Sequence, residues 1–512
     1  MNTAVTPTAT RSRALASLGI PLLGVLAAIQ GSAPNIAATA LVGASRGLDM
    51  VGGDQALAAS MQTLAIAASV ITTGLLADRI GRRRMLVIAL LVAIAGQLLV
   101  AAAPAALVYI AGQAVSGVGL GAVYAAAFAY IQVLAAPGRL PAAVATFAAV
   151  AGASSVAFTF AGGLLASADW RLAFVLVPIL SALSVIAVLA LLPAVVPTLT
   201  GKRDVWGQLL LTAGMVVFLY GVSQLATSLT DPLTWGVMAA GAILLAGFVW
   251  SQTRVAKPFF PVGLFRRPLF LAALCAGFVF NFGVAASFLQ LTNLWQYVLG
   301  LSPSAVALWQ LPITLTSIVG AILLGRLMTR GMSDQTSLLL GGLLAAAGFV
   351  AGALARESDS PLAFVPAGIL IALGVTAAAL PYGTLILSEA PAEFYGPVTS
   401  SRTTFGQLFY SLGTALSTVV VTQLTVHGII GRLSAGMNAS EVAAALKSVG
   451  TFAKDGVRPD PAVFNAAVAA YRDGFGVLMI SIAVISVVVG VLGSRLIARA
   501  RREQDGTPTA HP

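Results

Sequence analysis

The acidic and histidine side chains, which could carry protons in a reaction or a transport cycle, lie outside the middle of every apolar run in this sequence. The chain has 17 acidic residues and 2 histidines. Proton transfer inside a membrane needs a carboxyl or imidazole group whose pKa burial brings near neutrality. Asp54 and Glu389 are candidates at the boundaries of apolar runs, although each is also explained as a solvated charge at a helix end. No proton carrier can therefore be assigned from the sequence.

Cysteine usage and the content of the apolar runs exclude most enzymatic and metal chemistry. The single cysteine, Cys275, lies within an apolar run, which excludes an intramolecular disulfide and a multi-cysteine metal site. The apolar runs also lack a Ser/His/Asp set, paired carboxylates and a cluster of metal-binding residues. We therefore expect a protein that is not an enzyme and that uses no cofactor and no metal.

The composition places the chain in a membrane. Charged residues make up 9% of it, against about 25% in soluble domains, while 58% are hydrophobic and the mean hydropathy is +0.96. The net charge of +11 comes from lysines and arginines in polar segments between the apolar runs. This distribution favours lipid headgroups and membrane topology, and not a nucleic acid, as the reason for the basic residues.

Apolar windows of about 20 residues predict fourteen transmembrane helices. They lie near residues 14–42, 56–78, 85–103, 105–135, 141–166, 172–192, 205–227, 235–251, 269–291, 304–328, 337–355, 361–388, 398–424 and 474–497. An even number of spans puts both termini on one side, and most lysines and arginines lie in the tails and in the loops on the side of Asp78. The positive-inside rule makes that side cytoplasmic. The first run is too long for the core of a signal peptide and should be a retained helix.

Polar turns near residues 201–204 and 254–268 bracket one helical pair and give a 6+2+6 arrangement. The expected parts are a cytoplasmic tail (1–13), a six-helix bundle (14–194), an inserted two-helix linker (195–268), a second six-helix bundle (269–498) and a cytoplasmic tail (499–512). The second bundle includes a long extracytoplasmic loop, 425–473, in which residues 439–449 and 461–471 have helical spacing. The loop is expected to be a solvated connector, with a cap over the exit as the alternative.

The most distinctive segment is residues 74–84, which packs five charges into a turn between two apolar runs. It follows the pattern G-x-L-a-D-r-x-G-r-r, which resembles the loop motif of the major facilitator superfamily. Residues 170–178, 204–209, 248–266 and 296–312 resemble further segments of the fourteen-helix drug/proton antiporters within that superfamily. The resemblance covers nearly the whole chain and implies an all-α integral membrane protein with the major facilitator fold.

The acid of this motif, Asp78, ends a predicted helix, where the helix dipole disfavours an anion. The resemblance implies that Asp78 faces the start of the thirteenth helix near Arg402, which adds a full positive charge. Asp78 could thus latch the two bundles together, and a charge cluster that only sets topology is the alternative. The residues of the expected latch are Gly74, Asp78, Arg79, Gly81, Arg82, Arg83 and Arg402.

Three motifs depart from the antiporter pattern. Gln30 stands where the family typically has an aspartate in its first helix, and Gln113 stands where the superfamily has an arginine in its fourth. Phe158 and Thr159 replace the glycine and proline of the fifth-helix motif. Because glutamine does not titrate, the groups usually implicated in proton transfer are missing.

The expected substrate cavity is polar but uncharged. Its candidate lining consists of amides and aromatic rings, namely Gln30, Asn35, Gln113, Tyr124, Asn281, Gln290, Trp309, Gln310, Gln407 and Tyr410. Such a lining suits an uncharged or amphipathic solute. Buried amides also bond membrane helices to one another, at about 0.6–2 kcal/mol per pair, so a structural role is the alternative for each of them.

These features predict a secondary active transporter that exports lipophilic or amphipathic small molecules by rocking one bundle against the other. An ion-independent facilitator, an importer, and a transport-deficient sensor or scaffold are the alternatives. The expected partners are a small-molecule substrate, the lipid bilayer, and protons without an assigned carrier residue. We expect a monomer in the bacterial inner membrane, with many spans and both termini in the cytoplasm.

Overall fold

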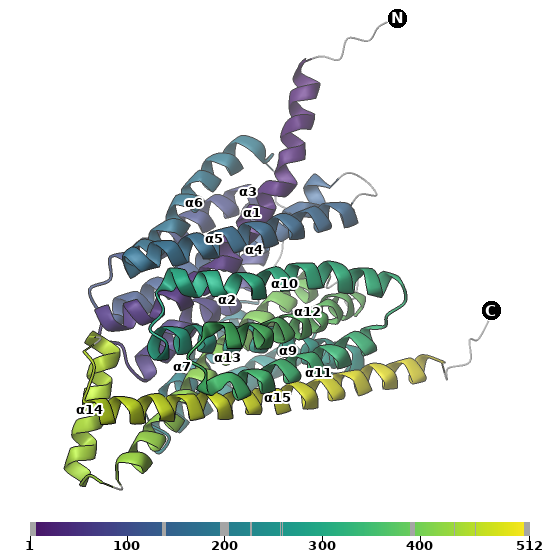
Figure 1. The fold of residues 1–512 in the computed structure, drawn as a ribbon. Helices are drawn as coiled ribbons and strands as arrows, with labels where there is room; N and C mark the ends of the chain where they lie inside the picture. The colour runs from purple at the N-terminus through teal and green to yellow at the C-terminus, as the bar shows by residue number, and fades with distance from the viewer. Residues whose placement is uncertain are drawn as a thin grey trace, which may run out of the picture. The chain divides into compact units, whose positions relative to one another are not determined.

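The chain is all-helical in the computed structural model, which describes residues 7–135, 140–194, 204–225, 228–255, 258, 260–389, 395–434, 436–455 and 457–505 (Figure 1). The long helices are α1 (Pro7–Gly47), α2 (Gly53–Ile80), α3 (Arg82–Ala101), α4 (Ala106–Leu134), α5 (Leu140–Ala168), α6 (Trp170–Leu191), α7 (Val205–Gln224), α8 (Pro232–Arg254), α9 (Pro268–Asn293), α10 (Pro303–Thr329), α11 (Asp334–Leu354), α12 (Val365–Ser388), α13 (Tyr395–Leu433) and α15 (Pro461–Asp505). The shorter elements are α14 (Ala439–Asp455), η1 (Val262–Arg266), the π-helical turn η2 (Leu294–Val298), η3 (Ala355–Glu357) and η4 (Pro361–Phe364).

Thirteen helices in the described part of the chain are long and apolar enough to cross a membrane, namely α1, α3 to α13 and α15. α2 adds a helix of 28 residues, part of whose side chains lie outside the described residues. Each of these helices overlaps one of the spans predicted from the sequence. The predicted fold class, an all-α integral membrane protein, is therefore confirmed.

The chain divides into two compact units. Unit 1 consists of Met1–Ala40 and Met61–Arg203, and unit 2 consists of Leu41–Ser60 and Asp204–Pro512. Most of α1 to α6 therefore belongs to unit 1, whereas the turn between α1 and α2 belongs to unit 2. The predicted inserted pair, α7 and α8, packs with unit 2, where α7 contacts α13 and α8 contacts η1.

Small residues allow the helices of unit 1 to approach closely. A Cβ atom on Gly119 of α4 would lie 2.5 Å from the backbone nitrogen of Ala93 on α3. Gly96 on α3 faces the backbone of Ser116 on α4 in the same way. In a membrane the hydrophobic effect does not drive helices together, because lipid tails are as apolar as the side chains. Close van der Waals packing of this kind therefore holds the helices together.

Aromatic side chains fill the core of unit 2. Trp295, Phe349, Phe364 and Phe475 are at most 1% exposed and belong to one cluster. The ring centroid of Phe364 lies 6.5 Å from that of Trp295 and 6.2 Å from that of Phe475, both with interplanar angles of 81°. These edge-to-face contacts, which aromatic rings prefer, join η2, η4 and α15.

The segment predicted as a long loop, 425–473, is mostly helical. α13 continues to Leu433, α14 follows a polar turn, and α15 begins at Pro461. At the start of α14, Glu441 and Asn438 cap each other, because the Glu441 N–H donates to Asn438 Oδ1 and the Asn438 N–H donates to Glu441 Oε2. The helical spacing predicted for its two parts is confirmed, and the extracytoplasmic position of the segment stays a prediction.

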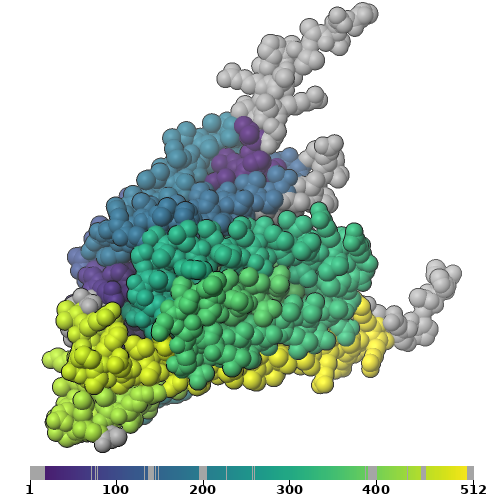
Figure 2. Space-filling view, viewed as in Figure 1, coloured from purple at the N-terminus to yellow at the C-terminus, as the bar shows by residue number. Residues whose placement is uncertain are grey.

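The apolar faces of these three helices explain why the segment is helical. They form a cluster of their own, made of Ile429, Leu433, Val442, Ala445, Val463 and Ala470. α14 and the adjoining ends of α13 and α15 are the yellow and yellow-green end of unit 2 in Figure 2. Two ion pairs stabilise this end of unit 2. Arg472 Nη2 on α15 lies 2.5 Å from Asp359 Oδ1 in the turn between η3 and η4, and Asp473 on α15 pairs with Arg432 on α13.

Candidate transport site

The turn between α2 and α3 carries the charge cluster of unit 1. α2 ends at Ile80 and α3 begins at Arg82, so Gly81 alone connects them. The φ of Gly81 is 95°, in the left-handed region that residues with a side chain rarely adopt. Gly74 faces α4 near the end of α2. Asp78 lies in the last turn of α2, and its side chain is outside the described residues.

The arginines of the cluster bond within unit 1. Arg82 Nη1 donates to the Ala129 carbonyl of α4 at 2.7 Å, and Arg83 Nη2 donates to the Leu189 carbonyl of α6. Both carbonyls lie in the C-terminal part of their helices, where the helix dipole favours a positive charge. Arg82 and Arg83 therefore tie the turn to α4 and α6, a structural role that was not predicted. Arg79 is half-buried at the end of α2.

Arg402 on α13 is held by Tyr382 on α12. The guanidinium carbon lies 5.1 Å from the centroid of the Tyr382 ring, and the Tyr382 hydroxyl donates to the Arg402 carbonyl. The buried Nε of Arg402 has no hydrogen-bond partner among the described residues. α13 begins at Tyr395, so Arg402 lies about two turns inside the helix and not at its start. The helix dipole therefore contributes less at Arg402 than the sequence suggested, whereas the guanidinium charge is retained.

Buried amides connect α2, α3 and α4 in unit 1. Gln62 and Gln97 both donate to the Ser116 hydroxyl, at 3.2 and 2.8 Å, and Gln113 donates to the Tyr109 hydroxyl at 3.1 Å. All five side chains are at most 2% exposed. Gln113 thus bonds inside its own unit, which favours the structural alternative for this candidate. No local pattern in the sequence pairs Gln62, Gln97 and Ser116, which were not predicted.

The other candidates of unit 1 form an amide and aromatic set without charge. Gln30 on α1 is 4% exposed, and Asn35 on the same helix is half-buried. Tyr124 on α4 is half-buried, and its ring stacks on Phe128 with centroids 6.2 Å apart. Phe147 of α5 meets Tyr124 edge-on at 6.5 Å. Phe128 and Phe147, which were not predicted, therefore extend the aromatic surface around the candidate Tyr124.

Two candidate amides of unit 2 are buried between helices. Gln290 on α9 donates to the Ser417 hydroxyl of α13 at 3.0 Å, and Gln310 on α10 donates to the Thr292 hydroxyl of α9 at 2.7 Å. Gln290 is 1% exposed and Gln310 is 5% exposed. These bonds join α9 to α13 and to α10, so they favour the structural alternative for both residues.

The remaining candidates of unit 2 are half-buried, namely Asn281, Trp309, Gln407 and Tyr410. Asn281 Nδ2 donates to the Gly277 carbonyl one turn earlier on α9, at 2.8 Å. Gln407 Oε1 on α13 has no hydrogen-bond partner within the described ranges. On the same two helices, the Phe278 and Phe409 rings meet edge-on with centroids 5.4 Å apart. Amide and aromatic groups therefore share one region of α9 and α13.

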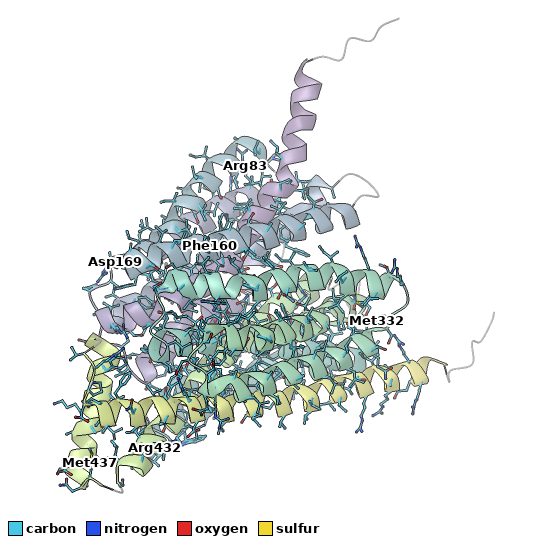
Figure 3. All side chains as sticks on the ribbon, in the orientation of Figure 1. Arg83, Phe160, Asp169, Met332, Arg432 and Met437 are labelled. Carbon is cyan, nitrogen blue, oxygen red and sulfur yellow. The ribbon has the colours of Figure 1, made fainter. Side chains whose placement is uncertain are left out.

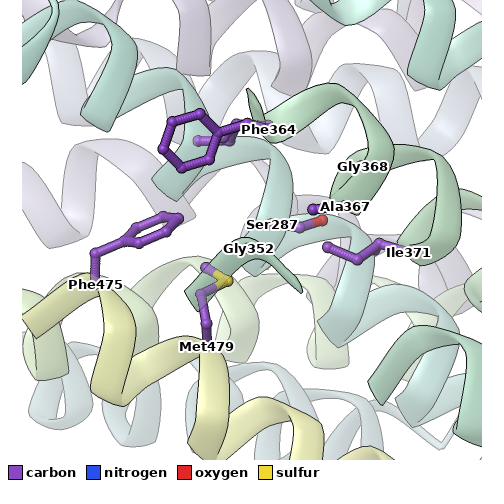
Figure 4. Close-up of a pocket in the computed structure, with 9 residues that line it drawn as sticks. Ser287, Gly352, Phe364, Ala367, Gly368, Ile371, Phe475 and Met479 are labelled. Atoms are coloured by element: carbon purple, nitrogen blue, oxygen red, sulfur yellow. The ribbon is translucent and has the colours of Figure 1, made fainter. Parts of the chain in front are cut away.

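A small apolar cavity lies inside unit 2 (Figure 4). It is lined by Ser287, Leu291, Gly352, Phe364, Ala367, Gly368, Ile371, Phe475 and Met479. The Ser287 hydroxyl is already bonded, because it donates to the Gly283 carbonyl at 2.7 Å. The cavity volume of about 20 Å³ is far below the roughly 300–1,000 Å³ of sites for drug-sized molecules. This cavity is therefore too small to be a transport chamber.

An all-helical membrane chain of two units, with uncharged polar side chains set among its helices, has the construction of a membrane transporter. The family model for the Major Facilitator Superfamily matches residues 20–414. The chain belongs to this family, which confirms the resemblance seen in its charged turn.

Similar proteins include several resistance and export proteins. The chain is 30% identical over 411 residues to the puromycin resistance protein pur8 of Streptomyces alboniger, covering 78% of this chain and 80% of that protein. It is 31% identical over 372 residues to the tetracenomycin C resistance and export protein of Streptomyces glaucescens, covering 70% and 67%. It is 27% identical over 397 residues to the multidrug efflux pump LfrA of Mycolicibacterium smegmatis, covering 76% and 77%. The chain is thus a secondary transporter of the major facilitator type, and it has drug exporters among its relatives.

Solved structures share the fold. A bacterial homologue of the human lysosomal transporter Spinster, in an inward-facing and unoccupied conformation, matches with a TM-score of 0.68 and 16% identity over 99% of this chain and 100% of that one. A peptide transporter, POT, in complex with sulfate matches with a TM-score of 0.63 and 18% identity over 94% and 95%. At these identities the similarity concerns the fold alone.

Proposed function

We propose that this chain exports lipophilic or amphipathic small molecules across a bacterial inner membrane. The observation that carries the proposal is the chemistry of the half-buried candidates, Asn35, Tyr124, Asn281, Trp309, Gln407 and Tyr410, which offer hydrogen bonds and aromatic rings but no charge. Sites of this kind bind apolar molecules through a few polar anchors. The relatives named for puromycin resistance, tetracenomycin C export and multidrug efflux support both the direction and the substrate class.

The proposed cycle is alternating access, in which the two six-helix bundles rock about a substrate site. Asp78 and Arg402 form the latch of one state in this proposal. A carboxylate at the C-terminal end of α2 is disfavoured by the helix dipole and gains from a cationic partner. The buried Nε of Arg402, which lacks a hydrogen-bond partner within the described residues, supports its assignment as that partner. A charge-assisted bond made in one state only would favour that state.

Topology and assembly complete the proposal. The excess of arginine on the Asp78 side of the predicted spans supports two cytoplasmic termini. We propose that the protein works as a monomer, carries its substrate unchanged and catalyses no reaction. Its partners are then the transported molecule and the surrounding lipid.

Coupling of the cycle to protons would require a titratable carrier residue. Gln30 and Gln113 do not titrate, so a proton carrier would have to be an acid at the membrane boundary. Among these, Glu389 Oε2 lies 3.4 Å from Arg267 Nη1, and this contact favours a structural ion pair. A facilitator driven by the substrate gradient alone is therefore the second candidate.

The test is flux of puromycin and a panel of lipophilic compounds through proteoliposomes that contain the full chain, with and without a pH gradient. Flux accelerated by the gradient supports a proton-coupled exporter, and equal flux in both conditions supports the facilitator. Empty liposomes are the control for passive leakage. Compound binding without any flux would contradict transport and would favour the sensor or scaffold.

A further inference from the structure

One side of α15 is exposed from Val477 to Arg502, and its chemistry changes sharply near the C-terminal end. Val477, Ile480, Val484, Val488 and Leu492 are 51%, 44%, 58%, 58% and 51% exposed. They recur every three or four residues, which places them on one face of the helix. Since α15 is a membrane-spanning helix by length and hydropathy, an exposed apolar stripe of this kind faces lipid tails.

Arginines continue this stripe. Arg495 and Arg499 follow Leu492 at spacings of three and four residues and are exposed. Arg502 is exposed three residues after Arg499, and Arg501 beside it adds a further exposed charge. The opposite side of these turns is buried, with Ile497 1% exposed. By helical periodicity Arg495, Arg499 and Arg502 lie on the side that the apolar stripe occupies, whereas Arg501 is exposed on another side of the same turn. Figure 3 shows side chains projecting from these turns away from the neighbouring helices.

The depth of the arginines matches the surface of a bilayer. Val477 and Arg495 are 18 residues apart, or about 27 Å along a helix at 1.5 Å per residue. The hydrocarbon core of a bilayer is about 30 Å thick. When the apolar stripe lies in the lipid tails, Arg495 and Arg499 therefore lie at the level of the headgroups.

Few acids neutralise this end of unit 2. Arg499 Nε lies 2.8 Å from Glu503 Oε1, whereas Arg495, Arg501 and Arg502 have no carboxylate partner among the described residues. α11 runs beside α15, since a Cβ atom on Gly490 would lie 3.2 Å from the Cα atom of Gly342. The turn between α10 and α11, which contains Met332, lies at the same end as the arginines (Figure 3).

A second pair of arginines adds to the positive charge at this end. Arg326 and Arg330, at the end of α10, are exposed and also lack a carboxylate partner within the described ranges. Asp334 in the same turn accepts a hydrogen bond from the Thr384 hydroxyl at 2.8 Å. The end of unit 2 that bears the α15 arginines therefore carries a net positive surface.

We propose that the C-terminal turns of α15 bind the headgroups of anionic phospholipids through Arg495, Arg499, Arg501 and Arg502. A guanidinium donates two parallel hydrogen bonds to a phosphate, and each basic residue near an anionic surface adds attraction that salt screens. Lipid is favoured over a soluble anion because Arg495, Arg499 and Arg502 extend a lipid-facing apolar stripe. The binding site fixes the depth and tilt of α15, and through it of unit 2, in the membrane.

The experiment is a titration of phosphatidylglycerol into the detergent-purified full chain, followed by native mass spectrometry, with phosphatidylcholine as the neutral lipid. We expect phosphatidylglycerol to bind more tightly than phosphatidylcholine. Replacing all four arginines with Gln should weaken phosphatidylglycerol binding roughly tenfold or more, whereas Lys, which keeps the charge but loses the paired hydrogen bonds, should weaken it less. Neither readout depends on transport, so its failure would leave the proposed export function untouched.

Three outcomes would overturn the proposal. The first is equal phosphatidylglycerol affinity in the wild type and in the Gln variant. The second is equal affinity of the wild type for the two lipids. The third is full competition by inorganic phosphate at lipid-like concentrations, which would assign a soluble anion to the site. Should the Gln variant fail to fold, the wild type alone still decides, because an affinity that does not fall with added salt contradicts an arginine site.

Discussion

The guanidinium carbon of Arg46 lies 5.8 Å from the centroid of the Tyr297 ring, inside unit 2. The Phe452 ring of α14 lies at the same distance from Arg46, and Gln55 Nε2 donates to the Tyr297 hydroxyl at 3.1 Å. The turn between α1 and α2 is thus joined both to the π-helical end of α9 and to α14. Because α1 passes from unit 1 into unit 2 just before this turn, we interpret the contact as the anchor of the turn in unit 2.

Replacing Arg46 with Met should loosen α14. The change keeps an unbranched side chain but removes the cation that two rings share. Such a contact contributes about 0.5–1 kcal/mol at exposed sites, and this is a lower bound here because Arg46 is half-buried. We expect amide hydrogen exchange in Ala439–Asp455 to become at least roughly two- to fivefold faster. Arg254→Met is the matched control, because it removes a similar contact with Trp250, at 5.6 Å, from α8. Unchanged exchange in α14 would mean that the rings hold the turn without the cation.

Replacing Arg82 with Gln should destabilise unit 1. The variant loses the hydrogen bond to the Ala129 carbonyl and the positive charge near the C-terminal end of α4. We expect the free energy of unfolding in detergent to fall by about 1–2 kcal/mol. Arg84→Gln is the control in the same turn, since the Arg84 side chain is exposed. Equal stability of the two variants would contradict the structural role of Arg82.

Replacing Asp78 with Asn should slow transport without the loss of stability expected for Arg82→Gln. Asparagine keeps the shape of the side chain but removes the charge that Arg402 is proposed to bind. Arg402→Gln should slow transport as well, and the double variant should be no slower than the worse single variant, because both changes break the same contact. Flux through proteoliposomes measures all three. Losses that simply add would argue that the two residues act separately.

Hydropathy was sufficient to predict the spans, because a helix in lipid must satisfy its own backbone and present apolar side chains over about 20 residues. It could not predict which face of each helix packs inside the protein. α4 and α10 are apolar on nearly all sides, so their periodicity carries little information about the buried face. Gln113 and Gln407 are both single amides within apolar runs, so the sequence does not distinguish them. In the structure the packing of neighbouring helices buries Gln113 fully and leaves Gln407 half-buried.

Hydrogen-bond partners were equally beyond the sequence. Arg82 and Ala129 are 47 residues apart, and Gln290 and Ser417 are 127 residues apart, so no local pattern links either pair. The same applies to the packing of α14 (Ala439–Asp455), which lies in the segment predicted between the last two spans. Its apolar positions had helical spacing, but the faces of α13 and α15 that cover them follow only from the tertiary contacts.

Adding a methyl group to Gly96 should also destabilise unit 1. The new Cβ atom would overlap the backbone of Ser116, so α3 and α4 would have to separate. Overpacking of this kind costs about 1–3 kcal/mol, which thermal unfolding in detergent can resolve. Gly236→Ala on α8 is the control, because its Cβ atom meets nothing within 4 Å and alanine is the better helix former. A Gly96→Ala variant as stable as this control would rule out the close approach of the two helices.

Two glutamines of unit 2 should respond in opposite ways to replacement by Leu. Gln290 donates to the Ser417 hydroxyl and is 1% exposed, so Gln290→Leu should lower the free energy of unfolding by about 0.6–2 kcal/mol. Gln407 is half-buried, and its buried Oε1 has no hydrogen-bond partner within the described residues. Because an unpaired buried oxygen costs free energy, Gln407→Leu should leave stability unchanged or raise it slightly.

The kinetics of transport should also distinguish Gln407→Leu from Gln290→Leu. If Gln407 contacts the solute, Gln407→Leu should raise the KM for substrates that accept or donate hydrogen bonds at that point and leave kcat nearly unchanged, because binding is lost in the ground state and the transition state alike. Gln290→Leu should lower the amount of folded transporter while the KM of the remaining molecules stays the same. A shift in KM for Gln290→Leu alone would reverse the two assignments and place the substrate against the interface of α9 and α13.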